Sequence, residues 1–363
     1  MKHLIFILTM GFALFSMHFG AGNLVYPLEL GCTFGAASLP ALCGLLVTAV
    51  GFPAVGFLSM ILFQGEPKAF FGRFGPIVAT LMIAIIVAVL GPFGSLSRCV
   101  ALTYTITQET YSGLSLEFFS AFSCLVIFAL LIRKNSVIAL LGKFLTPLLL
   151  LTLVTIMIGG LFSETSFSPE FEHSSLNFCK GIVVGYQTMD LLAALFFCHI
   201  LFKPLESYSR ENNISLFRVA FQTSCVASLL LILAYVGFGL LSAMHADLLK
   251  GICPELLLLR LSEAVLGKSG ALLTHALVVF ACLTTAMALG AIFADFLVMT
   301  VKLPYLAATA VTMSITYFVA TMGFTGIVAF LVPILDLLYP ILIVWSLYNL
   351  LCKKVTSVVE CAS

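Results

Sequence analysis

Apolar stretches long enough to cross a lipid bilayer recur along nearly the whole chain, and this recurrence constrains the fold more than any other feature. A membrane-spanning helix needs about 20 predominantly apolar residues. Ten stretches meet or approach that length: 4–30, 39–63, 76–105, 117–132, 137–162, 178–202, 216–243, 270–300, 304–321 and 326–351. Of the 363 residues, 9% are charged, against roughly a quarter in a soluble domain. We therefore expect an all-α polytopic membrane protein with about ten transmembrane helices.

The distribution of lysine and arginine supports this count. If the N-terminus lies in the cytoplasm, twelve of the 17 basic residues fall on the cytoplasmic side, four fall on the other side, and Arg98 lies within a span. Cytoplasmic loops of membrane proteins carry an excess of these residues, so we expect both termini in the cytoplasm. The net charge of +1 and the lack of long basic runs argue against nucleic acid as a partner.

The first apolar stretch is interrupted by the segment HFGAGNLVYP at residues 18–27. Unwound backbone at membrane depth is costly unless something satisfies its polar groups. The N-terminal end of a half-helix suits a carboxylate, and exposed carbonyls at the opposite end suit a cation such as sodium. We therefore expect a helix break around Gly20 and Gly22, with Pro27 near the start of the second half-helix. A simple kink or a packing notch is the alternative explanation.

A second interruption falls in the sixth apolar stretch. The segment VVGYQTMDLL, residues 183–192, places Gly185, Gln187, Thr188 and Asp190 near the middle of that stretch. Five stretches precede residue 163 and five follow it, so the two interruptions occupy matching positions. Transporters are often built from inverted repeats that bind substrate between two broken helices. We expect a 5+5 inverted repeat with helices 1 and 6 broken, comprising residues 1–163 and 164–352, followed by a short cytoplasmic tail at 353–363.

Several polar residues within the spans are candidates for binding. The adjacent hydroxyls of Thr284 and Thr285 lie in the middle of the eighth stretch, where they suit either a hard cation or a hydrogen bond between helices. Asp190 suits a substrate ammonium group or a coupling proton. Arg98 is expected to pair with a carboxylate, and His18 to be a packed, hydrogen-bonded neutral histidine rather than a proton relay.

Five motifs, spread in order over nearly the whole chain, resemble a known family. They are FGAGNLVYP in helix 1, GPFGSLSR in helix 3, GYQTMD in helix 6, ACLTTA in helix 8 and VPILDLLYP in helix 10. Their combination resembles the branched-chain amino acid:cation symporters of the BrnQ (LIVCS) type, which are similar to the larger leucine-transporter-like superfamily. That superfamily has a five-plus-five inverted repeat.

The resemblance implies specific site residues. It places the substrate at the two breaks, where the matching positions are Ala21, Gly22, Asn23, Gly185, Tyr186, Gln187, Thr188 and Asp190. It places a sodium ion between helix 1 and helix 8, where the matching positions are Ser16, Phe19, Ala281, Thr284 and Thr285. Family members usually continue for two more helices beyond LLCKKVTSVVECAS, and we expect the ten-helix core to suffice for transport.

These observations lead to one expected function and several alternatives. We expect a secondary symporter in the bacterial plasma (inner) membrane that imports leucine, isoleucine and valine, driven by Na⁺ or by H⁺. The alternatives are an amino-acid receptor without coupled transport and a carrier of another small neutral amino acid. An enzyme is not expected, because neither H-E-x-x-H nor G-x-S-x-G occurs. The sequence gives no indication of oligomeric state.

Overall fold

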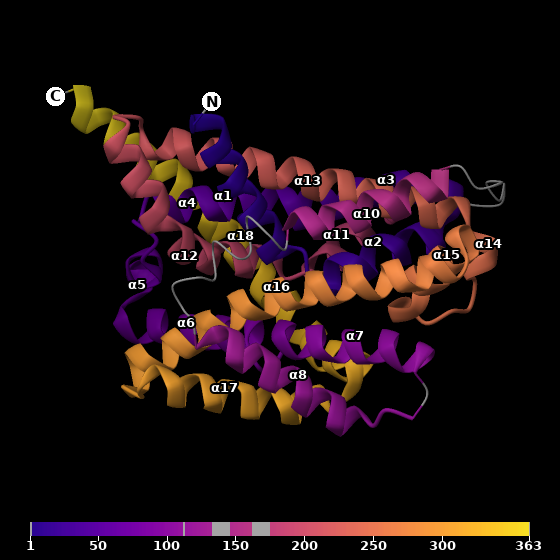
Figure 1. Cartoon of the computed structure of the whole chain (residues 1–363). Coiled ribbons are helices and arrows are strands. Elements are labelled where there is room, and N and C mark those ends of the chain that lie inside the picture. The colour runs from indigo at the N-terminus through magenta and orange to yellow at the C-terminus, as the bar shows by residue number, and fades with distance from the viewer. Residues whose placement is uncertain (1, 112, 133–145, 162–174, 363) are drawn as a thin grey trace.

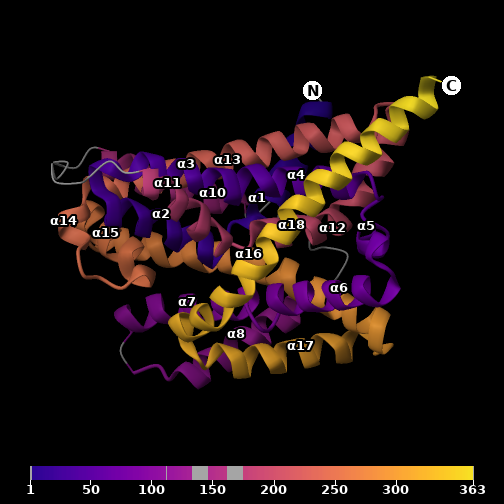
Figure 2. The ribbon, with the colours of Figure 1, turned by 180° about the vertical axis from the view of Figure 1, so that it is seen from behind.

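The computed structural model describes residues 2–111, 113–132, 146–161 and 175–362, and its regular elements in these ranges are all helices. The long helices run roughly alongside one another (Figure 1). The view from behind shows helix α18 crossing the others obliquely toward the C-terminus (Figure 2). The all-α prediction is therefore confirmed.

The first apolar stretch forms two helices rather than one. Helix α1 covers Lys2–His18, and α2 covers Ala21–Phe34. Between them Gly20 has an extended backbone, with φ −115° and ψ −155°. Pro27 lies inside α2 rather than near its start, so that prediction was wrong. Helix α2 restarts directly after Gly20, and its proline lacks the N–H that would bond to the carbonyl of Asn23.

The chain turns at Gly35, where φ is +46°, and runs back beside α1 and α2 (Figures 1 and 2). This return segment is helical throughout but changes its winding midway. Its parts are the 3₁₀ turn η1 at Gly35–Ala37, α3 at Ser38–Leu46, the π turn η2 at Val47–Gly51 and α4 at Phe52–Ile61. Helix α3 packs against α11, and α4 packs against α12.

The third apolar stretch is also divided. After two short elements, α5 at Pro67–Phe71 and η3 at Gly72–Phe74, it forms α6 at Pro76–Leu90 and α7 at Ser95–Thr110. The Gly91–Gly94 segment between α6 and α7 is the glycine-rich part of the GPFGSLSR motif. The next two helices are α8 at Leu116–Leu131 and α10 at Thr146–Leu161.

The sixth apolar stretch breaks where the sequence predicted. Helix α11 ends at Tyr186, α12 begins at Asp190, and Met189 between them has a left-handed backbone with φ +61°. The remaining elements follow in order. They are α11 at Ser175–Tyr186, α12 at Asp190–Glu211, α13 at Leu216–Met244, α14 at Ala246–Leu249, η6 at Pro254–Leu256, α15 at Leu257–Leu266, α16 at Lys268–Val301, α17 at Tyr305–Ala320 and α18 at Gly323–Ala362.

Six helical segments among the described residues are long and apolar enough to cross a membrane, and four shorter apolar helices accompany them. One of the six, Ala21–Ile61, contains the turn at Gly35 and so covers parts of two predicted stretches. The exact count of ten spans therefore stays a prediction. The start of the predicted stretch 137–162 and the predicted boundary between the halves, after residue 163, lie outside the described residues.

Candidate substrate and cation site

The first break exposes the start of a helix in the middle of the protein. The backbone N–H groups of Ala21, Gly22 and Asn23 belong to the first turn of α2, where no earlier turn supplies carbonyl acceptors. The first bond of the new helix runs from Leu24 N to the carbonyl of Gly20, at 3.3 Å. The side-chain Oδ1 of Asn23 reaches back to accept from Gly20 N at 3.3 Å. This turn therefore presents a partial positive charge suited to an anion.

The two breaks contact each other at Gly22. A Cβ atom at this position would lie 3.2 Å from Cα of Thr188 and 3.3 Å from the carbonyl oxygen of Gln187. It would also lie 3.1 Å from Cε2 of Tyr26. Two of these three neighbours are backbone atoms of the second break, so they cannot rotate away. Glycine at position 22 thus allows the first turn of α2 to approach the unwound part of helix 6.

A buried hydrogen-bond network joins the breaks. Asn23 Nδ2 donates to Asp190 Oδ2 at 2.7 Å and also to the hydroxyl of Tyr235. That hydroxyl donates to Asp190 Oδ2 at 2.9 Å. The side chains of Asp190 and Tyr235 are 1% and 0% exposed. The structure therefore brings together Asn23 and Asp190, both predicted as site residues from the sequence. It adds Tyr235 of α13, which was not predicted.

The other predicted residues of the second break have distinct surroundings. The Thr188 hydroxyl donates to the carbonyl of Gly185 at 2.9 Å and closes a turn. The ring of Tyr186 stacks on that of Tyr339 from α18, with centroids 4.6 Å apart. The side-chain oxygen of Gln187 is buried and has no hydrogen-bond partner among the residues that the structure describes. The second break thus leaves one acceptor free.

Four of the five predicted cation ligands converge between α1 and α16. The hydroxyl of Thr284 lies 2.9 Å from the carbonyl oxygens of both Ser16 and Ala281, and that of Thr285 lies 3.4 Å from the Ser16 carbonyl. A hydroxyl has one proton, so Thr284 can donate to only one of these carbonyls at a time. Carbonyl and hydroxyl oxygens are ligands that suit a hard cation such as sodium.

Phe19, the fifth predicted ligand, lies at the break itself, and its ring stacks on Phe15 with centroids 5.1 Å apart. Its neighbour Gly20 faces helix α16, because a Cβ atom at Gly20 would lie 2.9 Å from the Thr285 hydroxyl. The break therefore lies directly against the threonine pair. No cluster of three or more His, Cys, Asp or Glu side chains suited to a metal occurs in the part of the chain that the structure describes.

Arg98 does not pair with a carboxylate among the described residues. Its side chain is 0% exposed, and Nη1 donates to the hydroxyl of Tyr26 at 3.1 Å. Its Nε and Nη2 atoms have no partner. The predicted ion pair is therefore replaced by a hydrogen bond from the charged guanidinium to a neutral hydroxyl group. Asp190 and Tyr339 approach Arg98 closely enough for electrostatic interaction.

His18 is packed and hydrogen-bonded, as one of the two interpretations of the sequence predicted. Its Nδ1 donates to the carbonyl of Leu14 at 2.9 Å, and its ring meets that of Phe197 edge-on, with centroids 4.9 Å apart. In the described part of the chain its Nε2 forms no hydrogen bond, although the backbone of Asp190 lies close to the His18 side chain.

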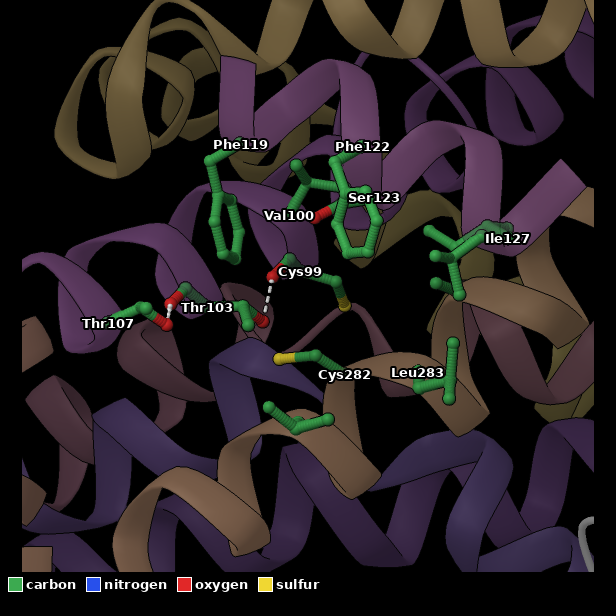
Figure 3. Close-up of a pocket in the computed structure, with 13 residues that line it drawn as sticks. Cys99, Val100, Thr103, Thr107, Phe119, Phe122, Ser123, Ile127, Cys282 and Leu283 are labelled. Atoms are coloured by element: carbon green, nitrogen blue, oxygen red, sulfur yellow. Dashed lines mark hydrogen bonds between the residues drawn. The ribbon is translucent and has the colours of Figure 1, made fainter. Parts of the chain in front are cut away.

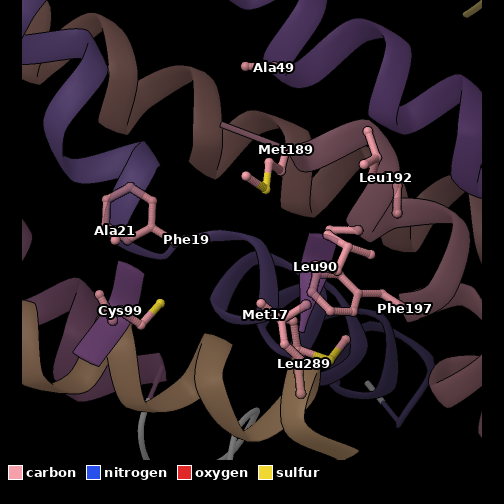
Figure 4. Packing of buried hydrophobic residues seen from close by; sticks show 14 of the residues in the cluster. Met17, Phe19, Ala21, Ala49, Leu90, Cys99, Met189, Leu192, Phe197 and Leu289 are labelled. Carbon is pink, nitrogen blue, oxygen red and sulfur yellow. The ribbon is translucent and has the colours of Figure 1, made fainter. Parts of the chain in front are cut away.

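The surroundings of the breaks are largely apolar. Figure 4 shows Phe19, Ala21 and Cys99 close together, with Met189 of the second break nearby. A cavity of about 230 Å³ lies between α7, α8 and α16, and its walls are mainly apolar (Figure 3). Cys99 and Cys282 both line this cavity (Figure 3). Because Cys99 also contacts the backbone of Ala21, the cavity adjoins the first break.

A solved structure shares this arrangement of helices. The fold is similar to that of MhsT, determined in complex with L-phenylalanine, with a TM-score of 0.54 and 19% identity over 87% of this chain and 80% of MhsT. MhsT has the leucine-transporter-like fold. The likeness therefore shows the leucine-transporter-like fold that the sequence resemblance implied.

The chain belongs to the branched-chain amino acid transport protein family, which it matches over residues 4–362. A "Putative branched-chain amino acid carrier protein" of Staphylococcus haemolyticus is 28% identical over 363 residues, covering 94% of this chain and 81% of its own length. A protein of Staphylococcus aureus (strain USA300) with the same description is 28% identical over 365 residues, covering 95% and 82%. The family resemblance inferred from the five motifs is thus confirmed, and the chain is an amino-acid transporter.

Proposed function

We propose that this protein imports the branched-chain amino acids leucine, isoleucine and valine by cation-coupled symport. The observation that carries the proposal is the contact between the two helix breaks at Gly22, which places a free helix N-terminus beside an unwound segment. Such a pair suits a small zwitterion, because one element offers N–H groups and the other offers carbonyls. The names of the staphylococcal relatives support branched-chain amino acids as the substrate class.

The substrate would be held by the residues of the two breaks. Its carboxylate would accept hydrogen bonds from the N–H groups at Ala21, Gly22 and Asn23. Its remaining atoms would meet the segment from Gly185 to Asp190, including Tyr186, Gln187 and Thr188. The cavity beside Cys99 has the apolar lining that an aliphatic side chain needs. One methylene changes binding by only about 1–3 kcal/mol, so we expect weak discrimination among the three substrates.

The coupling cation would lie between the first break and α16. Its ligands would be the carbonyls of Ser16, Phe19 and Ala281 and the hydroxyls of Thr284 and Thr285. All of these are neutral oxygens, so we propose Na⁺ as the coupling ion. Asp190 is the proton-carrying alternative, because it is a buried carboxyl group at the second break.

We further propose that the protein lies in the bacterial plasma (inner) membrane with both termini in the cytoplasm. The excess of lysine and arginine on one side of the predicted spans supports this orientation. Alternating access would then come from movement of the elements around the fixed breaks.

Leucine uptake into proteoliposomes, with sodium and proton gradients imposed separately, tests this proposal. Uptake driven by a sodium gradient alone would support the ligand set at Ser16 and the threonine pair. Uptake driven only by a proton gradient would reassign coupling to Asp190. Leucine binding without leucine counterflow would contradict transport and favour a receptor. A folded protein that binds alanine or serine but not leucine would contradict the substrate class.

A further inference from the structure

Arg98, in the first turn of α7, is a buried cation whose hydrogen-bonding capacity is mostly unused. Its side chain is 0% exposed. Nη1 donates to the Tyr26 hydroxyl at 3.1 Å, whereas Nε and Nη2 have no partner. Among the residues that the structure describes, Arg98 forms no ion pair. The buried carboxyl group of Asp190 interacts with Arg98 electrostatically but accepts no hydrogen bond from it among the described residues. Burying the unbonded N–H groups of a guanidinium is unfavourable, so Nε and Nη2 favour an anion that enters from outside the chain.

The free nitrogens lie on one edge of the guanidinium plane. Nε and Nη2 point their N–H bonds in parallel, which is the arrangement that binds both oxygens of a carboxylate at once. Lysine offers no such edge, because its ammonium group is a single point of charge. The unused part of Arg98 is therefore suited to a planar carboxylate in particular.

Arg98 also lies beside the first turn of α2. Its partner Tyr26 is one helical turn beyond Gly22, and the Tyr26 ring reaches to 3.1 Å from the Cβ position of Gly22. The next residue, Cys99, contacts the backbone of Ala21. The start of α7 thus flanks the N–H groups that begin α2, and both elements offer donors to the same region.

The second break offers an acceptor near the same turn of α2. The side-chain oxygen of Gln187 is buried without a partner, and the Gln187 backbone carbonyl lies 3.3 Å from the Cβ position of Gly22. An α-amino acid carries its carboxylate and its ammonium group on one carbon. Unpartnered donors at Arg98 and an unpartnered acceptor at Gln187 complement those two groups.

We propose that Arg98 binds the carboxylate of the transported amino acid through its Nε and Nη2 atoms, together with the first turn of α2. This inference rests on the proposed function and adds to it a charged side chain that selects substrates with a free carboxylate. It predicts that leucine is strongly preferred over leucinol, which keeps the side chain and the ammonium group but has no carboxylate.

Competition binding of leucine and leucinol to the purified full-length protein tests the proposal. The informative variant is Arg98→Gln, and the matched control is Arg260→Gln, which removes a half-exposed arginine paired with Glu109 and Glu263. Loss of a buried charge-assisted pair corresponds to roughly 100-fold in affinity. We expect Arg98→Gln to weaken leucine binding about 100-fold while leucinol affinity changes less than about threefold. Arg260→Gln should leave both affinities unchanged.

Two results would overturn the inference while leaving the proposed function intact. In the first, Arg98→Gln binds leucine nearly as well as the wild-type protein. In the second, leucine and leucinol lose affinity equally, which would indicate a structural role for Arg98. Replacing chloride by gluconate tests whether Arg98 binds an inorganic anion instead. The inference is also contradicted if leucine binding to the wild-type protein depends on chloride while Arg98→Gln still prefers leucine over leucinol.

Arg98→Lys covers the case in which Arg98→Gln does not fold. Lysine keeps the charge but lacks the pair of parallel N–H donors, so the preference for leucine over leucinol should fall by about tenfold. An unchanged preference would contradict the inference. A folded wild-type protein that binds no leucine would instead overturn the proposed function, and the inference with it. The two failures are therefore distinguished by the wild-type measurement.

Discussion

Replacing Gly22 by alanine is expected to slow leucine transport far more than it weakens leucine binding. The added methyl group would lie 3.2 Å from Cα of Thr188 and 3.3 Å from the carbonyl oxygen of Gln187. Both distances are shorter than ordinary van der Waals contact, and neither atom can rotate away. The two breaks must therefore separate by a few tenths of an ångström to accept the methyl group.

The energetic cost falls on conformations in which the breaks touch. Inserting a methyl group into a well-packed site costs about 1–3 kcal/mol, which corresponds to about 5–150-fold in an equilibrium constant. A transport cycle that passes through this closed contact should slow by a factor in that range. Gly22→Val adds two more methyl groups and should abolish leucine binding as well, because they would cover the first turn of α2.

The assay compares the rate of leucine uptake in proteoliposomes with leucine affinity in detergent, at matched amounts of folded protein. Gly326→Ala is the control, since a Cβ atom at Gly326 has Met322 Cβ at 3.5 Å as its nearest neighbour, an ordinary contact. Uptake by Gly22→Ala within twofold of the wild-type rate would refute the idea that the closed contact at Gly22 is part of the cycle.

Two further predictions concern the cation site and the network between the breaks. Replacing Thr284 and Thr285 together by valine should abolish gradient-driven leucine uptake, because the cation site beside the Ser16 carbonyl loses two hydroxyl ligands. Unchanged sodium-driven uptake would show that neither residue belongs to the site. Tyr235→Phe removes a hydrogen bond to buried Asp190 and should destabilise the protein by about 1.5–3 kcal/mol. Thermal unfolding, monitored by size-exclusion chromatography, measures this loss of stability. An unchanged melting temperature would show that the Tyr235 hydroxyl does not contribute to stability.

Both breaks in helices 1 and 6 could be predicted because glycine and polar residues interrupt otherwise apolar runs. The observed breaks, at Phe19–Gly20 and at Gln187–Met189, fall inside the predicted segments. The position of Pro27 was misjudged because proline is common at a helix start, whereas here the polar side chain of Asn23 allows α2 to begin earlier.

The contacts that hold the breaks together could not be predicted from local pattern. Asn23 is 167 residues from Asp190 and 212 residues from Tyr235, and nothing in the sequence fixes their pairing. Tyr235 lies in the apolar run 216–243, which contains none of the five motifs. The expectation for Arg98 followed from the general rule that buried charges are paired, but its protein partner is the hydroxyl of Tyr26.

The π turn at Val47–Gly51 makes the packing of α3 and α4 sensitive to the number of residues between them. Each residue of an α-helix turns the helix face by about 100°, and a π turn accommodates one residue more than an α turn. This offset lets α3 lie against α11 while α4 lies against α12, so one segment supports helix 6 on both sides of its break. Substitutions within 47–51 should be tolerated where they fit, whereas deleting a single residue there would rotate α4 away from α12.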